Sequence, residues 1–374
     1  MTDLATEIRH PISALIHPTW ACNLHCLYCY SGKSDVFGKM SADVLRNTLF
    51  QLAEHNHKFQ RTKIIWHGGE PTLMGQEFFE TVLQIQSEFG ERHTFVNLLQ
   101  TNCTAISPRF MDFLIKNKFN VGTSLDGNKS LHDSQRVNKA GEGTHESVAS
   151  AIEYFRSHGC SVNSLAVMTA NTLKNLDEFY EFIRSQSEYS IKINPLIYAG
   201  YACDHNNLSI SPEQYGHAMI YLFDRWIDEE EGHFNIEPLA EMLIALTSGN
   251  VKTCAFSGNC LDFFIGIDYS GNITPCGKWA GSDFCLGNIN DTTLSQALQS
   301  PNAKLFREKR EIALGLCKGC KYLHICNGGC PHNSYMINQD ITVKDFYCEA
   351  YRIIFQHIEK VVQKEISYVQ ETRN

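Results

Sequence analysis

The sequence contains no apolar run that approaches the roughly 18 residues of a membrane-spanning helix. Positive charge is also scarce, since 32 Lys and Arg residues stand against 41 Asp and Glu residues and give a net charge of -9. A basic stripe of the kind that binds nucleic acid is absent. The N-terminal segment includes acidic side chains and lacks a long apolar centre, so it does not resemble a secretory signal. We therefore expect a cytoplasmic protein that binds neither membranes nor nucleic acid.

Cysteine, by contrast, is abundant, with 15 residues in a chain of 374. Thiols stay reduced in the cytosol, so disulfides are not expected there. Four cysteines are scattered and have the character of ordinary thiols: Cys103, Cys160, Cys203 and Cys285. The other eleven fall into two dense groups. Such grouping in a cytosolic protein predicts metal binding or redox chemistry.

The first two thirds of the chain alternate short apolar runs with segments that carry apolar residues at helical spacing. A repeat of roughly 30 residues is typical of βα units, which predict a parallel sheet, open or closed into a barrel. The strand candidates are residues 12–17, 62–68, 94–100, 120–126, 161–169 and 190–197.

Beyond about residue 250 the helical and strand periodicity weakens, and Cys and Gly crowd together. Residues 266–277 predict a hairpin, and residues 291–300 a helix capped by Asp291 or a following Thr. We expect an α/β domain over residues 1–235 and a smaller domain over 236–374, held by metal. The second domain ends in a helix from residue 348 that packs on the first, with a frayed tail.

The first cysteine group, Cys22, Cys26 and Cys29, directly follows the first expected strand. Three thiolates can hold three irons of a four-iron cluster and leave the fourth iron open to a non-protein ligand. An open position is typical of catalytic metal centres. The alternative is zinc, which requires a fourth ligand, and His25 lies within the loop.

With Tyr28 before its last cysteine, this loop resembles the signature of the radical SAM superfamily. The run Gly68-Gly69-Glu70-Pro71 resembles the GGEP motif of that family, whose backbone and carboxylate hold the amino group of S-adenosylmethionine (SAM). The resemblance implies a partial (β/α)6 barrel with its site at the C-terminal ends of the strands. It also implies that SAM bound to the open iron is cleaved to a 5′-deoxyadenosyl radical, which abstracts hydrogen from a C–H bond.

The resemblance to one branch, the SPASM-domain peptide maturases and especially the anaerobic sulfatase-maturing enzymes, runs nearly end to end. It implies that the SAM pocket is lined by Tyr28, Gly69, Ser124, Arg136 and Leu196. Two of these also have ordinary interpretations, since Ser124 ends a strand and Leu196 could belong to the core. Gln100 and Asn102 follow another strand, and they either face the site or form a turn.

The second group has eight cysteines, the number that two four-iron clusters require. A zinc ribbon is the alternative, because C-x2-C pairs are common there. The resemblance to SPASM domains implies an interleaved assignment, with one cluster held by Cys254, Cys260, Cys276 and Cys330, and another by Cys317, Cys320, Cys326 and Cys348. Closed clusters of this kind carry electrons. The expected cofactors are thus three [4Fe-4S] clusters and SAM, with an external electron donor such as a flavodoxin or ferredoxin.

Gly277 departs from the sulfatase-maturing pattern, in which an Asp after the corresponding cysteine is thought to act as the base. Glycine cannot accept a proton, so the general base stays unassigned. Gly277 is common among SPASM maturases that crosslink ribosomal peptides. We therefore expect an aromatic-to-Cβ crosslink in a precursor peptide, with formylglycine formation on a sulfatase as the alternative.

Two further alternatives stay open: oxidation of a small molecule, and a non-catalytic iron–sulfur electron carrier, against which the open cysteine triplet argues. The residues that could contact a peptide substrate are Tyr198, Tyr201, Asp204 and His205, although they could equally be ordinary loop residues.

Overall fold

The structure is a computed structural model that describes residues 11–31, 38–186, 190–229, 234–251, 253–258, 260–279 and 283–372. Residues 1–10, half of the N-terminal segment compared above with a secretory signal, lie outside this range. The chain forms two compact units, each assembled from separated segments. The first comprises Met1–Cys22, Ser34–Val121 and Asn259–Arg307, and the second comprises Asn23–Lys33, Gly122–Gly258 and Glu308–Asn374. Strands and helices alternate in both units, which confirms the α/β class.

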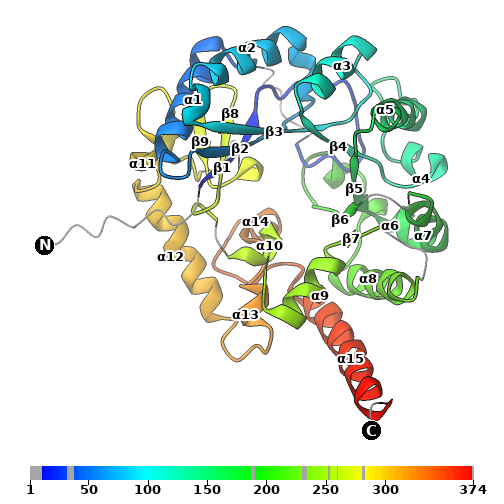
Figure 1. Ribbon diagram of the computed structural model, residues 1–374. Coiled ribbons are helices and arrows are strands. Elements are labelled where there is room, and N and C mark those ends of the chain that lie inside the picture. Colours follow the sequence, from blue (N-terminus) through cyan, green and yellow to red (C-terminus); the bar gives the residue numbers. More distant parts are fainter. Residues whose placement is uncertain are drawn as a thin grey trace, which may run out of the picture. The chain divides into compact units, whose positions relative to one another are not determined.

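The first unit contains a sheet in the order β10-β9-β8-β1-β2-β3. Its strands are β1 (Ser13–His17), β2 (Arg61–Trp66), β3 (Thr94–Thr101), β8 (Phe264–Asp268), β9 (Asn272–Thr274) and β10 (Gly287–Asn288). β1 runs parallel to both β2 and β8, and β2 runs parallel to β3. The connecting helices are α1 (Ala42–His55), α2 (Gln76–Ser87) and α3 (Pro108–Lys116), which flank these strands in Figure 1. The predicted βα alternation is therefore present.

The predicted hairpin is formed by β8 and β9, which are antiparallel. Asp268 closes its turn by accepting hydrogen bonds from the backbone N–H groups of Ser270 and Asn272. The parallel pairing of β8 with β1 over five residues was not predicted, because it joins segments about 250 residues apart. The predicted helix that follows is α11 (Leu294–Ala297), and its cap is Thr293 rather than Asp291.

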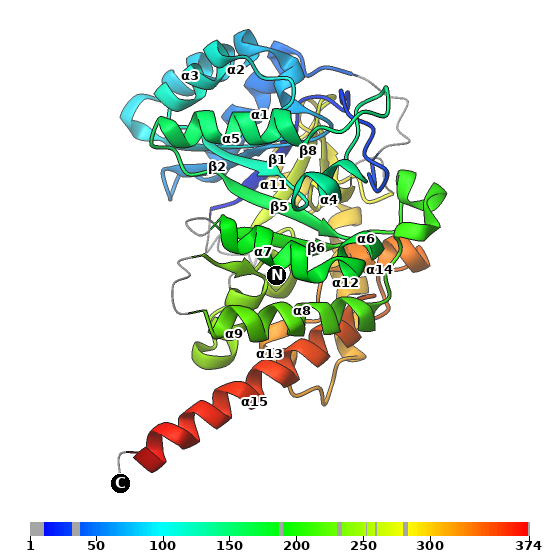
Figure 2. The same ribbon diagram turned by 90° about the vertical axis from the view of Figure 1, so that its right-hand side faces the viewer.

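The second unit contains the parallel strands β4 (Asn120–Ser124), β5 (Asn163–Met168), β6 (Ile191–Pro195) and β7 (Ile236–Glu237). β4 begins at the end of the first unit and pairs with β5 from Gly122 onward. Figure 2 shows β5 and β6 with the helices that surround them. These helices are α4 (Lys129–Asp133), α5 (His145–Ser157), α6 (Ala170–Lys174), α7 (Leu176–Ser185), α8 (Pro212–Ile227) and α9 (Leu239–Ser248). β7 was not predicted, since two residues carry no detectable alternation.

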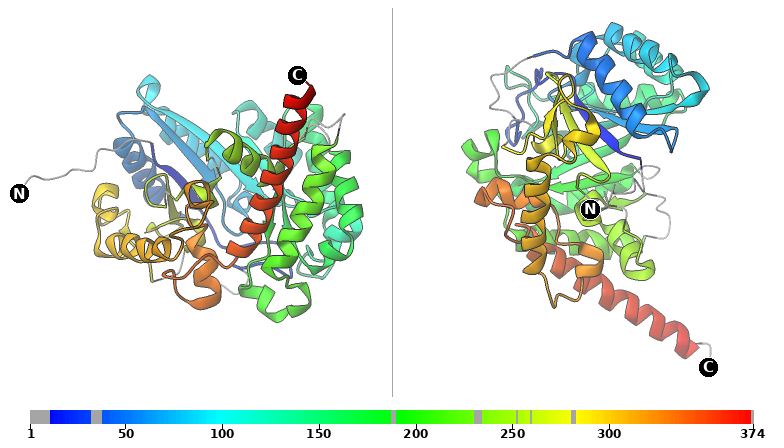
Figure 3. Two further views of the ribbon diagram at one scale, coloured as in Figure 1. Left: turned by 90° about the horizontal axis from the view of Figure 1, so that it is seen from below. Right: turned by 90° about the vertical axis from the view of Figure 1, so that its left-hand side faces the viewer.

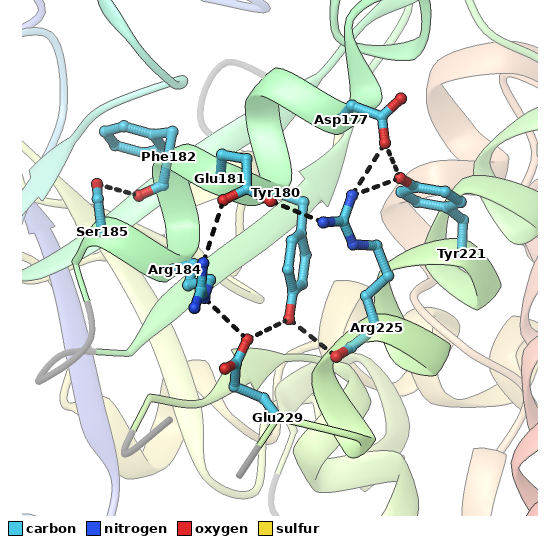
Figure 4. Close-up of polar contacts among 9 residues, drawn as sticks. All are labelled: Asp177, Tyr180, Glu181, Phe182, Arg184, Ser185, Tyr221, Arg225 and Glu229. Atoms are coloured by element: carbon cyan, nitrogen blue, oxygen red, sulfur yellow. Dashed lines mark hydrogen bonds and ion pairs between the residues drawn. The ribbon is translucent and has the colours of Figure 1, made fainter. Parts of the chain in front are cut away.

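Helices α7 and α8 are joined by a polar network around Arg225, which Figure 4 shows. The Arg225 guanidinium contacts Asp177 at 2.9 Å and Glu181 at 2.7 Å, and the hydroxyl of Tyr180 donates to the Arg225 carbonyl at 2.9 Å. The hydroxyl of Tyr221 donates to Asp177. Most of these groups are exposed, so the network orients two neighbouring helices and carries little of the stability.

The cysteine-rich part of the second unit consists of short helices: α10 (Cys254–Ser257), α13 (Leu323–Cys326) and α14 (Pro331–Asn338). α12 (Pro301–Gly315) leads into this part, and the long helix α15 (Cys348–Thr372) ends the chain. α15 packs along α8 and α9, as Figure 3 shows from below. The expectation of a frayed tail was wrong, because α15 continues to Thr372 through a sequence rich in helix-forming Lys, Glu and Gln. Within the described residues, no helix has the length and apolar character of a membrane span.

Candidate active site

The GGEP segment of the first unit lies against the loop that follows β1. The N–H of Gly69 donates to the Thr19 carbonyl at 3.1 Å, and the N–H of Glu70 donates to the Ala21 carbonyl at 2.8 Å. A Cβ on Gly69 would lie 2.3 Å from the Ala21 oxygen. Gly68 has a φ of +122°, which disfavours any L side chain. Both glycines are therefore required for the close approach of these two loops.

The Glu70 carboxylate is buried, with 1% of the residue exposed. Its Oε1 accepts from the N–H and hydroxyl of Thr72, at 3.0 and 2.7 Å, and from the hydroxyl of Thr101 at 2.7 Å. Its Oε2 accepts from the N–H of Asn102 at 2.7 Å. Burial raises the pKa of Glu70, whereas these hydrogen bonds lower it. The carboxylate thus connects the segment after β2 with the end of β3, and its hydrogen bonds here are to donors of the protein itself.

Asn102 connects this motif to the cysteine triplet. Its side-chain amide lies 3.9 Å from the Cys22 sulfur, and its oxygen accepts from the N–H and hydroxyl of Thr104. Gln100, the other polar candidate here, is half-buried within β3. The structure therefore places Asn102 beside a cysteine, while Glu70 fixes the backbone that presents it.

Two imidazoles lie at the C-terminal ends of β1 and β2, and the sequence had not singled them out as site residues. The ring centroids of His17 and His67 are 5.7 Å apart. The N–H of Gly68 donates to Nδ1 of His67 at 2.7 Å, so the proton of the neutral ring lies on Nε2. Burial, together with the charge of Lys278, lowers the pKa of His67 to about 4. The signal that could have found them is a His at the end of each of two neighbouring parallel strands.

In the second unit, Tyr28 is the centre of a buried hydrogen-bond network. Its hydroxyl donates to Asp126 Oδ2 at 2.5 Å and accepts from the Arg136 guanidinium at 2.6 Å. Asp126 is fully buried and also accepts from the Gln135 amide and from the N–H of Val167. Tyr28 and Arg136, both named from the resemblance, are thus brought together. Asp126 was missed, although a carboxylate directly after a strand was a visible signal.

The Nε of Arg136 is buried and has no hydrogen-bond partner among the described residues. A buried donor without a partner carries a desolvation cost of about 1–3 kcal/mol. A bound ligand with an oxygen acceptor would remove this cost. This guanidinium therefore fits the role of an anion or ribose contact.

Cys26 and Cys29 lie together in the second unit, where the N–H of Cys29 donates to the Cys26 carbonyl at 3.0 Å. Burial raises the pKa of the Cys26 thiol to about 11, although the charge of Arg136 lowers it. The thiol is therefore neutral unless a metal stabilises the thiolate. These side chains fit an iron–sulfur cluster, because thiolates are the ligands of such clusters. The cation of Arg136 lies near the Cys26 thiol.

The remaining pocket candidates of the second unit lie at strand ends. Ser124 is the last residue of β4 and is half-buried. Leu196 directly follows β6, is buried, and packs in a cluster with Tyr28, Ala202 and Leu208. Its carbonyl accepts from the Tyr347 hydroxyl at 2.6 Å. Ser124 and Leu196 therefore both lie at the C-terminal ends of parallel strands. Leu196 also packs against Tyr28.

The loop after β6 contains the four residues considered for substrate contact. The N–H of Tyr201 donates to the Cys29 carbonyl at 2.9 Å, and its ring lies 4.2 Å from that of His25. Tyr198 donates to Asn206 and is exposed. Asp204 and His205 lie in short turns of the same loop. Tyr201 therefore supports the triplet loop, whereas Tyr198 is available at the surface.

Tyr198 also borders a small hollow with a volume of about 10 Å³. The polar groups of this hollow are already engaged, because Asn333 donates to Asp345 and Tyr347 donates to Leu196. Its wall is otherwise apolar, with Leu196, Ile197, Met336, Ile337 and Phe346. A hollow of this size has room for about one water molecule and none for a side chain.

The C-terminal cysteines are divided between the units. Cys317, Cys320, Cys326 and Cys348 all belong to the second unit. Burial raises the pKa of Cys326 to about 12, and the neighbouring Cys348 and Cys317 raise it as well. The pKa of Cys348 is also raised by burial, by Cys317 and by Cys320. These effects indicate that Cys317, Cys320 and Cys326 each lie near Cys348.

Of the other four cysteines, Cys254 and Cys330 belong to the second unit, and Cys260 and Cys276 to the first. Cys276 follows β9, where its carbonyl accepts from the Thr274 hydroxyl. All 15 cysteines are free of disulfides. Over the ranges that the structure describes, no three His, Cys, Asp or Glu side chains are grouped as ligands of a metal ion.

Two segments of the chain match known protein families. The family model of the radical SAM superfamily matches residues 16–183, and that of SPASM, an iron–sulfur cluster-binding domain, matches residues 254–321. A cysteine-type anaerobic sulfatase-maturating enzyme of Clostridium perfringens is 29% identical over 358 residues, which cover 93% of this chain and 96% of the relative. A serine-type enzyme of Bacteroides thetaiotaomicron is 26% identical, with 93% and 89% covered.

A solved structure described as native anSMEcpe with bound AdoMet and Cp18Cys peptide matches with a TM-score of 0.81 at 27% identity. The match covers 95% of this chain and all of that one. The expected order of the two domains is thereby confirmed, and with it the iron–sulfur and SAM-binding character of the protein. The chain is a radical SAM enzyme with a SPASM domain.

Proposed function

We propose that this enzyme oxidises a side chain of a peptide or protein, and that the reaction is the conversion of Cys or Ser to formylglycine. The observation that carries the proposal is the near full-length similarity to cysteine-type and serine-type anaerobic sulfatase-maturating enzymes. The structural match to a peptide-bound enzyme supports a peptide partner. Formylglycine formation, the alternative weighed from the sequence, is therefore better supported than the crosslink that the sequence led us to expect.

We assign three [4Fe-4S] clusters to the chain. Cys22, Cys26 and Cys29 would hold the cluster that binds SAM. Cys317, Cys320, Cys326 and Cys348 would hold one auxiliary cluster, and the proximity of their thiols supports this set. Cys254, Cys260, Cys276 and Cys330 would hold the other. The external donor would be a flavodoxin or ferredoxin.

When bound and reduced, the cluster and SAM supply a 5′-deoxyadenosyl radical that removes hydrogen from the substrate. The residues of this chain orient and enclose the reactants. Gly68 and Gly69 allow the backbone after β2 to approach its neighbour closely, and Glu70 holds Asn102 in place. Arg136 presents a buried, unpartnered Nε, so it would contact a ligand oxygen. Ser124 and Leu196 would line the same pocket.

A crosslink in a ribosomal peptide is the second candidate, and Gly277 is the observation that favours it. Glycine has no carboxylate, so this position cannot supply the base. Proximity accelerates the intramolecular addition of a carbon radical to an aromatic ring. Rearomatisation of the ring would then release one proton and pass one electron to an auxiliary cluster. The two candidates differ in product, since only formylglycine contains an aldehyde.

In the test, the anaerobically reconstituted enzyme is incubated with SAM, a reductant and one of two sulfatase-derived peptides. The two peptides are identical except for Cys or Ser at the target position. We expect an aldehyde that reacts with a hydrazide probe, and an Ala peptide provides the matched control. SAM cleavage without any aldehyde would reject formylglycine formation. An aromatic-containing peptide that loses two hydrogens and resists fragmentation between two residues would establish the crosslink instead.

A further inference from the structure

The loop between Cys326 and Cys330, which connects α13 to α14 in Figure 1, has an unusual backbone. Its three inner residues, Asn327, Gly328 and Gly329, have φ values of +47°, +73° and +72°. Gly adopts this left-handed conformation freely, and Asn adopts it more readily than most residues, so neighbouring groups select it here. The structure contains two such groups, Arg310 and Asp345.

Arg310, on α12, is buried and donates to all three carbonyls of this loop. Its guanidinium contacts the oxygens of Asn327 at 2.5 Å, of Gly329 at 2.6 Å and of Gly328 at 3.3 Å. A Cβ on Gly328 would lie 3.3 Å from the guanidinium, so glycine permits this approach. Only 6% of Arg310 is exposed, which places a positive charge inside the cysteine-rich part of the unit.

Asp345 holds the other side of the loop. Its Oδ2 accepts from the N–H of Cys330 at 2.6 Å, while the adjacent carbonyl of Gly329 faces Arg310. The N–H of Tyr347 and the amide of Asn333 also donate to this carboxylate. A Cβ on Gly329 would lie 2.4 Å from Asp345, so glycine is required again. One peptide group is therefore held between a buried cation and a buried anion.

The direction of one further peptide group follows from covalent geometry. The C=O and N–H of a trans peptide point in opposite directions. Because Arg310 holds the Asn327 carbonyl, the N–H of Gly328, the second residue after Cys326, points away from Arg310. The N–H of Cys348, a ligand assigned to the same cluster as Cys326, donates to the carbonyl of Asp345 at 2.9 Å. Both buried charges thus lie beside backbone that carries proposed cluster ligands.

We propose that Arg310 and Asp345 are positioning residues that set the reduction potential of the cluster assigned to Cys317, Cys320, Cys326 and Cys348, an inference that rests on that assignment. Hydrogen bonds to the ligand sulfurs and nearby charge are the means by which a protein tunes such a cluster. Reduction adds negative charge to the cluster. Arg310 stabilises the reduced form through its charge, and Asp345 opposes it.

The test measures midpoint potentials by EPR-monitored titration of the full-length reconstituted enzyme. The background variant has Cys22, Cys26 and Cys29 replaced by Ala, so only the auxiliary clusters contribute. Arg310→Met should shift one cluster to more negative potential, and Asp345→Asn should shift the same cluster to more positive potential. Arg310→Lys, which keeps the charge but loses the planar fork, should give a smaller negative shift. Arg307→Met is the matched control: one turn earlier on α12, this side chain contacts the Leu298 carbonyl and Asp262.

Cys326→Ala, added to the background variant, identifies the affected cluster by removing its signal. If this substitution removes no cluster, the proposed assignment fails and the inference with it. If the cluster is present and both Arg310→Met and Asp345→Asn leave its potential unchanged, the inference fails while the assignment stands. Should Arg310→Met not fold, the positive shift in Asp345→Asn still decides the question.

Discussion

The hydroxyl of Tyr28 stands between Arg136 and Asp126, accepting from the first at 2.6 Å and donating to the second at 2.5 Å. Tyr28→Phe would leave the guanidinium of Arg136 buried without this acceptor. Loss of a partner by a buried polar group costs about 1–3 kcal/mol. We expect a lower urea midpoint and weaker SAM binding, with iron content retained. Tyr221→Phe, which removes an exposed hydroxyl from the α7–α8 network, is the control and should preserve SAM affinity. Equal SAM affinity in both variants would contradict the role given to Tyr28.

Glu70→Gln tests whether this carboxylate organises the first unit. All four observed contacts bring N–H or O–H groups to the carboxylate. A glutamine side chain would place an NH₂ group, which is itself a donor, against some of these donors. We expect a loss of about 1–3 kcal/mol in the free energy of unfolding, and a decrease in SAM affinity through displacement of Asn102. Glu77→Gln, on the exposed face of α2, should change neither quantity. A fully stable Glu70→Gln enzyme would show that these contacts are dispensable.

His132 makes the second unit sensitive to acid. Burial lowers its pKa from 6.5 to about 4, and the N–H of Asp126 donates to its Nδ1 at 3.3 Å. Since the folded pKa lies below the unfolded one, the stability from the neutral ring is present above pH 6.5 and is lost as the pH falls towards 4. At pH 5 the loss is about 2 kcal/mol. In urea titrations at pH 7 and pH 5, His132→Gln should lose less stability on acidification than the native protein. An identical loss in both would refute this assignment.

Gly277→Ala tests how tightly the space beside His17 is filled. A Cβ there would lie 2.3 Å from Leu15 Cδ2 and 2.7 Å from His17 Nε2. Overpacking of this kind costs about 1–3 kcal/mol, which thermal unfolding measures. Removing the ring in the double variant His17→Ala/Gly277→Ala should recover part of that loss. Gly315→Ala, whose Cβ would meet nothing within 4 Å, is the matched control. A neutral Gly277→Ala variant would mean that this position tolerates side chains, and a carboxylate could then be installed there.

Sequence periodicity predicted the strands β1 to β6 because each is a short apolar run followed by a helical segment. It could not predict the pairing of β8 with β1, since pairing partners are chosen by tertiary contacts and not by local pattern. Among site residues, motifs led to Tyr28 and Arg136, which meet in the structure. The direction of the Glu70 carboxylate depends on donors 31 and 32 residues later in the chain, so the motif alone did not reveal it.

Arg310 is another residue whose contacts could not be predicted from the sequence alone. On the sequence it is one of several basic residues of a polar helix, and nothing in the spacing distinguishes it from Arg307. Only the folded chain places it against the three carbonyls between Cys326 and Cys330.

The measurement that tests the central claim most directly is the formation of 5′-deoxyadenosine by the reduced, reconstituted enzyme. The native protein should hold roughly 12 irons per chain and should cleave SAM. With Cys22, Cys26 and Cys29 replaced by Ala, about a third of the iron should be lost, and all 5′-deoxyadenosine with it, while the auxiliary clusters stay bound. SAM cleavage that persists in this triple variant would contradict the account.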